Sequence, residues 1–198
     1  MKKSILFLLG LLLYVTGFSQ TLRDSLFWTT PYYDIVYSEV LEQPRSAYYR
    51  VVCPTSTTSR AGMDFYTEKG IKTSDNKDYE NNVWDKGHLV PVGSLRCNKN
   101  MVYATFSYMN CALQHEKLNR GVWKALEARE QNLVTTNVEV YVSIQVDFAP
   151  NPQRLPTNAA IPSGFYKEIK YGNVKECYYF PNTIPTSSDY NTFKCNCR

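Results

Sequence analysis

The stretch Val138-Glu139-Val140-Tyr141-Val142-Ser143-Ile144-Gln145-Val146-Asp147-Phe148 decides the fold, because apolar and polar residues alternate along its whole length. Successive side chains of a strand point to opposite faces, so this alternation predicts a strand with one buried and one solvated face. The buried face is built of valine and isoleucine, which suit a pleated sheet. A sheet that is apolar on one face and polar on the other is typical of antiparallel pairing.

Other strands are predicted on both sides of this stretch. Residues 165–171 and 174–180 flank Gly172-Asn173, a two-residue connection that predicts a β-hairpin. Upstream, aromatic and β-branched residues predict an early strand over 48–53. The following residues, 54–82, are rich in Ser, Thr, Asp and Gly and predict a long loop.

The best helix is predicted over residues 120–131. Val122, Trp123 and Leu126 form an apolar stripe at helical spacing, and Asn119 can serve as the N-cap. Trp123 is expected to pack in the core behind the helix. The order of strands, helix and further strands predicts an α+β domain built on an antiparallel sheet. A length of 198 residues with 43% hydrophobic composition suits a single domain with one core.

The N-terminus predicts an export signal. Lys2 and Lys3 precede an apolar run, and Gly17-Phe18-Ser19 places small residues where a signal peptidase reads them. We expect a signal peptide over 1–19, cut between Ser19 and Gln20, and a single domain over 20–198. A membrane anchor is the alternative, but about fifteen apolar residues are short against the roughly 20 that a span needs. The protein is therefore expected to be secreted or periplasmic, without a membrane anchor.

The charge of the mature chain is nearly balanced. Removing Lys2 and Lys3 lowers the 22 basic residues to 20, against 18 acidic ones, so the formal charge becomes +2. Such a molecule does not attract polyanions as a whole, and any affinity for nucleic acid must come from a local cluster. The candidates for this cluster are Arg60, Lys86, Arg96, Lys99, Lys117 and Arg120. For Lys99 and Lys117, an ordinary solvated surface charge is the preferred interpretation.

Six cysteines remain after export: Cys53, Cys97, Cys111, Cys177, Cys195 and Cys197. An exported chain meets an oxidising environment, so disulfides are expected, and fifteen complete pairings exist. Cys195 and Cys197 are too close to prefer each other, so each is expected to pair with a distant cysteine and to tether the C-terminal tail. A bridge from Cys111 would brace the loop beside Asn110. Zinc binding is the weaker alternative, since no Cys-x-x-Cys pair is present.

The residues with chemical potential are concentrated in Asp85-Lys86-Gly87-His88 and in Asn119 and Glu127, which lie on or beside the predicted helix. A histidine can accept a proton from water near neutral pH. An amide oxygen can bind a hard cation such as Mg²⁺, and a nearby carboxylate can hold that cation's water. Together they indicate a metal-dependent phosphodiesterase centre, although each alone is more often a structural histidine, a helix cap or a solvated acid.

The chain resembles the DNA/RNA non-specific endonuclease family, a group of ββα-metal nucleases. The family pattern Asp-Arg-Gly-His, then Asn, then Asn-x-x-x-Trp-x-x-x-Glu is matched by Asp85-Lys86-Gly87-His88, Asn110, Gln114, Asn119, Trp123 and Glu127. Asp78-Tyr79 and Ile161-Pro162-Ser163-Gly164-Phe165-Tyr166-Lys167 extend the likeness over roughly residues 32–182. Lys86 departs from the pattern, because it keeps the charge of arginine but loses the planar fork. Leu113 replaces a common proline, a change expected to alter a loop.

The resemblance implies an α+β fold whose antiparallel sheet carries a ββα-metal active-site motif. It also implies that Asn119 binds the metal directly and that Glu127 acts through metal-bound water. Eight residues separate the two, so on an ideal helix they lie about 80° apart and roughly 12 Å along the axis, which disfavours direct binding by both. A single protein ligand leaves the ion mostly hydrated, which favours Mg²⁺, with Mn²⁺ as the alternative.

Five further residues are expected to support the reaction. Lys86 and Arg120 would add positive charge beside the phosphate, and Arg60 would contact the phosphate from the long loop. Asp85 is expected to brace the motif through hydrogen bonds. Asn110 is expected to support the geometry of the metal site.

We therefore expect a secreted, metal-dependent endonuclease that hydrolyses DNA and RNA. His88 would take the proton of the attacking water, and the hydrated metal would stabilise the transition state and the leaving oxygen. Because the expected contacts address phosphate and not bases, little sequence preference is predicted. Two alternatives remain, a catalytically weak nucleic-acid-binding protein on the same fold and a disulfide-stabilised surface protein. The sequence does not indicate an oligomeric state.

Overall fold

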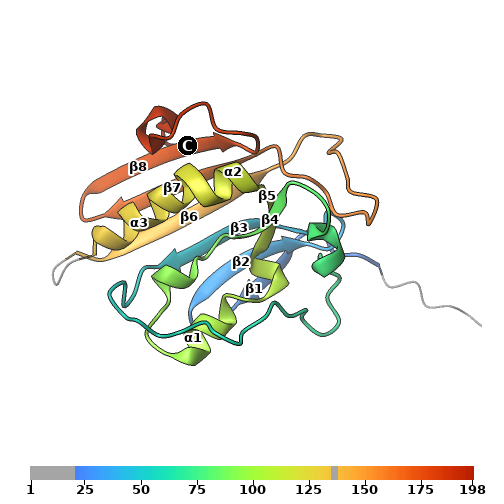
Figure 1. The fold of residues 1–198 in the computed structure, drawn as a ribbon, viewed down its shortest axis with the longest axis horizontal. Helices are drawn as coiled ribbons and strands as arrows, with labels where there is room; N and C mark the ends of the chain where they lie inside the picture. Colours follow the sequence, from blue (N-terminus) through green and yellow to red (C-terminus); the bar gives the residue numbers. More distant parts are fainter. Residues whose placement is uncertain (1–20, 135–137) are drawn as a thin grey trace, which may run out of the picture.

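The alternating stretch forms β6 (Val140–Asp147), an inner strand of a six-stranded sheet (Figure 1). The computed structural model describes residues 21–134 and 138–198, so the predicted signal peptide lies outside the described residues. The neighbours of β6 are β3 (Gln43–Arg50) and β7 (Gly164–Tyr171), and both pair with it in the antiparallel sense. The prediction of an antiparallel sheet around this stretch is therefore confirmed.

The sheet has the order β1-β2-β3-β6-β7-β8 and contains two strands that were not predicted. These are β1 (Leu26–Thr29) and β2 (Tyr33–Ser38), which are short and separated by a brief turn. The predicted hairpin is confirmed, since Tyr171 pairs with Val174 between β7 and β8 (Val174–Pro181), and Gly172 has a positive φ of 52° in the turn. The prediction for β3 was wrong at its start, because the strand begins with Gln-Pro-Arg-Ser, which has little of the composition of a strand.

A second, two-stranded sheet carries the motif. It consists of β4 (Trp84–His88) and β5 (Cys111–His115), which pair antiparallel and are followed by α2 (Glu116–Leu118) and α3 (Lys124–Asn132). The short helix α1 (Lys99–Ala104) lies in the connection between the two strands. The predicted ββα arrangement within an α+β fold is thus observed. None of the helices in the described part of the chain is long and apolar enough to cross a membrane.

The helical segment differs from its prediction. It begins at Glu116 and is capped by the side chain of His115, which accepts a hydrogen bond from the backbone N–H of Lys117 at 3.2 Å. Asn119 has helical backbone angles, so the prediction that it is the N-cap was wrong. Gly121, at φ −100° and ψ −114°, breaks the helix before α3. Spacings on an ideal helix therefore do not apply between Asn119 and Glu127.

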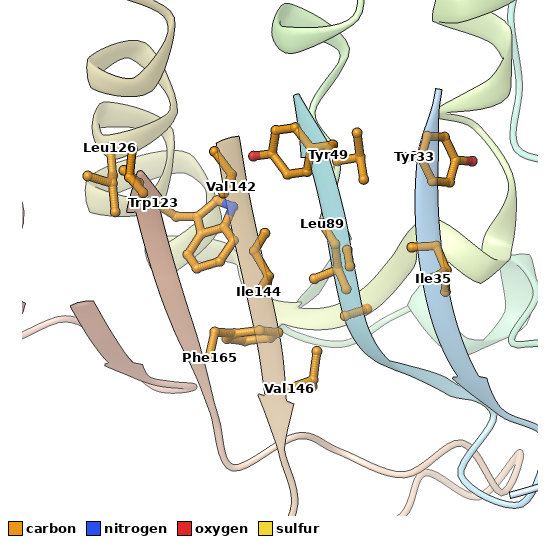
Figure 2. Close-up of a cluster of buried hydrophobic side chains, with 14 of the residues drawn as sticks. Tyr33, Ile35, Tyr49, Leu89, Trp123, Leu126, Val142, Ile144, Val146 and Phe165 are labelled. Carbon is orange, nitrogen blue, oxygen red and sulfur yellow. The ribbon is translucent and has the colours of Figure 1, made fainter. Parts of the chain in front are cut away.

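The core lies between the large sheet and this helical segment (Figure 2). Trp123 and Leu126 are fully buried against the side of the sheet that carries Val142 and Ile144, and the ring of Trp123 lies 5.4 Å from that of Phe165. Burial of each such side chain contributes about 1.5–3 kcal/mol. Trp123 is a core residue, as predicted, and its packing fixes the helix that presents Glu127.

Two disulfides form, Cys53–Cys97 and Cys177–Cys197, whereas Cys111 and Cys195 are free thiols. The predicted tether of the tail is therefore made by Cys197 alone, and the predictions for Cys195 and Cys111 were wrong. Cys111 is buried in β5, where the Tyr79 hydroxyl lies 3.3 Å from its sulfur. The backbone N–H of Cys195 instead donates to the carbonyl of Cys177 at 2.9 Å, so the tail covers the outer edge of β8.

Candidate active site

One hollow of about 870 Å³ collects most of the predicted site residues. It is bordered by β4, by the helical segment and by the long loop that precedes β4. Seven of the eight predicted residues line it: Arg60, Asp85, Lys86, His88, Asn119, Arg120 and Glu127. Asn110 does not line it. Residues that are up to 67 positions apart in the chain are therefore brought to one place.

The pairing of β4 with β5 requires a glycine at position 87. A Cβ atom there would lie 2.5 Å from the Cβ of Gln114 and 3.2 Å from the carbonyl oxygen of Ala112. Gly87 thus lets the two strands approach where His88 ends β4. Leu113, where the family commonly has proline, lies inside β5 and not in a loop, so that expectation was wrong. Its N–H donates to Gln43 Oε1 at 2.8 Å, a bond that proline cannot make.

His88 presents a neutral imidazole to the hollow. Its ring packs on Phe65 and Phe106, with ring centroids 5.0 and 5.4 Å away. Burial, and next the positive charge of Arg60, lower the pKa of His88 from 6.5 to about 4. Its buried Nε2 atom has no hydrogen-bond partner among the described residues. A neutral imidazole in the wall of a hollow is what a general base requires.

Asp85 links β4 to the helical segment. It accepts hydrogen bonds from Asn119 Nδ2 at 2.9 Å and from Arg120 Nε and Nη2 at 2.8 and 2.6 Å. Burial pushes the pKa of Asp85 upward, but the hydrogen bonds from Arg120 and Asn119 outweigh it, so the pKa lies below its ordinary value. Arg120 also lies 3.4 Å from Glu116. Two carboxylates therefore partly neutralise the charge of Arg120, although this side chain lines the hollow.

Asn119 and Glu127 supply oxygen atoms that suit a hard cation. Because Asn119 uses Nδ2 to reach Asp85, its Oδ1 atom is oriented away, and it accepts no hydrogen bond in the described part of the chain. Glu127 makes no ion pair there either, and burial raises its pKa to about 7 against the opposing effect of Lys167. No three His, Cys, Asp or Glu side chains within residues 21–134 and 138–198 cluster to hold a metal. The residues present fit an ion that keeps most of its water, such as Mg²⁺.

The Lys86 ammonium is held in the wall of the hollow. It donates to Asn76 Oδ1, and it lies 5.0 Å from the ring centroid of Phe65, 5.5 Å from that of Tyr108 and 5.9 Å from that of Tyr79. Each ring face attracts a cation, so together they compete with a phosphate for this charge. We refer to Asn76, Phe65, Tyr79 and Tyr108 as the ammonium cage.

The last two predicted residues are Arg60 and Asn110. Arg60 is exposed in the long loop, and its guanidinium makes no hydrogen bond or ion pair among the described residues. Asn110 is fully buried, where Oδ1 accepts from the N–H of Val90 and Nδ2 donates to the carbonyls of Val90 and Thr105. Arg60 is thus available to an anion, whereas Asn110 holds the backbone just beyond His88.

Sequence reasoning missed three residues of the hollow. Lys124 is exposed beside Glu127, one helical turn earlier, and this i,i+3 spacing could have revealed it. Phe65 and Phe106 pack against the imidazole. Phe65 lies in the long loop before β4, and Phe106 lies two residues after the end of α1. Nothing in their local sequence indicates that they meet His88.

A histidine at the end of the first of two antiparallel strands, with an amide and a carboxylate on the helix that follows, defines the ββα-metal class of nuclease folds. The chain belongs to the DNA/RNA non-specific endonuclease family, whose model matches residues 11–198. The resemblance inferred from the motifs is therefore confirmed. Members of this family are metal-dependent nucleases that act on nucleic acids.

Two known proteins illustrate the likeness. The chain is 30% identical over 70 residues to the mitochondrial nuclease EXOG of Danio rerio, an alignment that covers 35% of this chain and 20% of that protein. The chain thus matches only about a fifth of the length of that relative. The structure of EndoG in the EndoG/EndoGI complex, which describes EndoG inhibition, matches with a TM-score of 0.74 and 22% identity. That match covers 87% of this chain and 82% of EndoG, and it supports the fold.

Proposed function

We propose that the protein is an exported, metal-dependent endonuclease that hydrolyses phosphodiester bonds of DNA and RNA, with His88 as the general base. The observation that carries the proposal is the position of the His88 imidazole, which lines the same hollow as Arg60, Asn119 and Glu127. A lowered pKa keeps the imidazole ready to accept a proton at neutral pH.

In this mechanism, the His88 imidazole removes a proton from a water molecule, and the water oxygen attacks phosphorus in line with the leaving 3′ oxygen. A bound Mg²⁺, or Mn²⁺, would supply positive charge for the transition state and the leaving oxygen. Asn119 Oδ1 and the Glu127 carboxylate would hold this ion, Glu127 through water. Asp85 orients the Asn119 amide by accepting from Nδ2, so the amide oxygen faces outward.

Arg60 is the strongest candidate for binding phosphate. Its guanidinium lines the hollow and is not neutralised by a carboxylate among the described residues, unlike that of Arg120. Lys124 adds a second exposed charge beside Glu127. Such contacts to phosphate carry no sequence information, which supports cleavage with little sequence preference.

Export is part of the proposal. The disulfides Cys53–Cys97 and Cys177–Cys197 are typical of proteins that fold in an oxidising compartment. Together with the predicted signal peptide, they support a secreted or periplasmic enzyme.

The proposal is tested by incubating the purified mature protein with supercoiled plasmid and with RNA, in Mg²⁺ or in EDTA. We expect nicking and degradation of both substrates in Mg²⁺ and none in EDTA. A protein that retains plasmid in a gel-shift assay but never cleaves it would instead be the catalytically weak binding protein. Failure of both cleavage and binding would exclude both functions.

A further inference from the structure

A second, smaller hollow adjoins the proposed catalytic pocket. It has a volume of about 430 Å³, and its lining includes Phe65, Tyr66, Asn76, Lys77 and Tyr108. Phe65 borders both hollows, and it packs on His88 on the catalytic side. A nucleic acid strand with a phosphate beside His88 would therefore have this hollow next to the reacting nucleotide.

The ammonium cage fixes the amide of Asn76 at this hollow. Its Oδ1 atom accepts from both the Lys86 ammonium and the Tyr108 hydroxyl, the latter at 2.6 Å. With the oxygen turned toward these two donors, the NH₂ group must point away from them. The NH₂ group makes no hydrogen bond within the described residues, so it is free to donate to a ligand.

An aromatic ring is fixed in the same wall. Tyr66 stacks on Tyr103 with ring centroids 4.7 Å apart and an interplanar angle of 12°. This contact covers one face of the half-buried Tyr66 ring and restricts its rotation, while Tyr66 also lines the hollow. A restricted ring loses little entropy when a second planar group stacks on it.

We propose that this hollow binds an unpaired nucleobase next to the phosphate being cleaved, stacked on Tyr66 and accepting a hydrogen bond from Asn76. The proposal rests on the proposed nuclease function. Single-stranded nucleic acids are commonly bound by stacking on aromatic side chains and by hydrogen bonds to the base edges. Every base has a π face and at least one acceptor, so the hollow would favour unpaired strands without selecting a sequence. Lys77 adds a charge for a neighbouring phosphate.

The test compares two oligomers of equal charge on the full mature protein in EDTA, so that no cleavage occurs. One is a hexamer of deoxythymidine, and the other is a hexamer of abasic deoxyribose with the same phosphates. The wild-type protein is expected to bind the thymidine oligomer more tightly. Tyr66→Leu should weaken its binding about 5-fold or more, the lower range for loss of one stacked base, and should leave the abasic oligomer unaffected.

Tyr141 supplies a matched control. It stacks on Tyr48, with centroids 6.2 Å apart, in a hollow of about 710 Å³ that shares no residue with the catalytic pocket. Tyr141→Leu should keep both wild-type affinities. Thermal denaturation shows whether Tyr66→Leu remains folded. If it does not, Asn76→Ala replaces it as the test variant, because Asn76 is an exposed side chain. It should also reduce the preference for thymidine, and the equal charge of the oligomers removes any effect of the freed Lys86.

The base site would be overturned if Tyr66→Leu and Asn76→Ala weakened the binding of both oligomers equally. It would also be overturned if they weakened the binding of neither. If the wild-type protein cleaves plasmid in Mg²⁺ but binds the two oligomers equally well, the base site fails while the nuclease function stands. If it neither cleaves plasmid nor binds either oligomer, the proposed function fails as well.

Discussion

At the scale of single residues, the environment of His88 determines its protonation state. Phe65 and Phe106 exclude water from the imidazole, and Arg60 adds a positive charge nearby. Both effects disfavour the imidazolium ion. An ordinary histidine would be partly protonated at pH 6, whereas this one is almost entirely neutral.

The first prediction concerns this pKa. Because protonation removes the base, kcat/KM at a saturating Mg²⁺ concentration, which keeps Glu127 ionised, should fall as the pH drops through about 4 and not through the ordinary histidine value of 6.5. The same shift has a consequence for stability, since the unfolded chain binds the proton more readily. The contribution of neutral His88 to the free energy of unfolding should therefore be fully present above about pH 6.5 and be lost as the pH falls toward 4. An acid limb that stays at 6.5 when the Mg²⁺ concentration is raised would show that His88 is solvated or is not the base, whereas a limb that Mg²⁺ shifts would report Glu127, whose pKa is raised to about 7.

The second prediction concerns Lys86. The ammonium cage fits a compact charge, whereas a guanidinium is larger and planar. Lys86→Arg should displace Phe65 or Asn76 and lower kcat/KM several-fold, although it restores the residue of the family pattern. Lys124→Arg, an exposed charge in the same hollow, should have little effect. Higher activity in Lys86→Arg than in the wild type would mean that position 86 binds phosphate and that the cage is incidental.

At the scale of elements, helix α3 is fixed to the sheet by polar contacts as well as by packing. Glu130 on α3 accepts from Tyr49 at 2.8 Å and from Ser94 at 3.0 Å, and Lys167 of β7 lies 3.4 Å from its other oxygen. Both charged side chains are 0% exposed, and the Lys167 ammonium lies 4.0 Å from the ring centroid of Trp123. This network holds the helix one turn beyond Glu127.

The third prediction follows from this buried ion pair. Lys167→Met should destabilise the protein by about 3–5 kcal/mol, because it leaves Glu130 buried without its counter-charge. Adding Glu130→Leu should recover part of that loss, although Tyr49 and Ser94 then lose their acceptor. Urea denaturation of Lys167→Met, of Glu130→Leu and of the double variant measures both effects. If the double variant were as unstable as the sum of the two single ones, the two charges would not interact.

The sequence predicted an element correctly where the residues of that element alone carry the pattern. Alternation predicted β6, and a two-residue turn predicted the β7–β8 hairpin. It failed at Gly121, since a glycine within a helical pattern does not reveal whether the helix continues or breaks. The motif residues could be placed in one site from their spacing and family likeness. The ammonium cage could not, because three of its residues come from the long loop and Tyr108 precedes β5, so they meet Lys86 only through the tertiary fold.

At the scale of the whole molecule, the C-terminal tail closes one edge of the large sheet. The disulfide Cys177–Cys197 attaches it to β8, and Arg198 pairs with Asp147 at 2.9 Å on β6. None of these residues lines the catalytic pocket. The tail therefore stabilises the sheet without entering the site.

The fourth prediction concerns this tether. Cys197→Ser should lower the free energy of unfolding by about 2–4 kcal/mol, as expected for a disulfide that closes a short loop, and should leave activity at low temperature unchanged. Mass spectrometry of the alkylated, non-reduced wild-type protein should find two modified thiols, Cys111 and Cys195. If Cys197→Ser were as stable as the wild type, either Cys195 would have replaced Cys197 as the partner of Cys177 or the tether would contribute nothing. A peptide map separates these two outcomes.

The most direct test of the central claim, that His88 is the general base, is chemical rescue of His88→Gly. Plasmid cleavage in Mg²⁺ should fall by at least about 10²-fold in this variant, the low end of a general-base contribution. Added imidazole should restore part of the rate in proportion to its unprotonated fraction, while the circular dichroism spectrum stays that of the wild type. Wild-type activity in His88→Gly without imidazole would contradict the account, because the reaction would then not need the His88 imidazole.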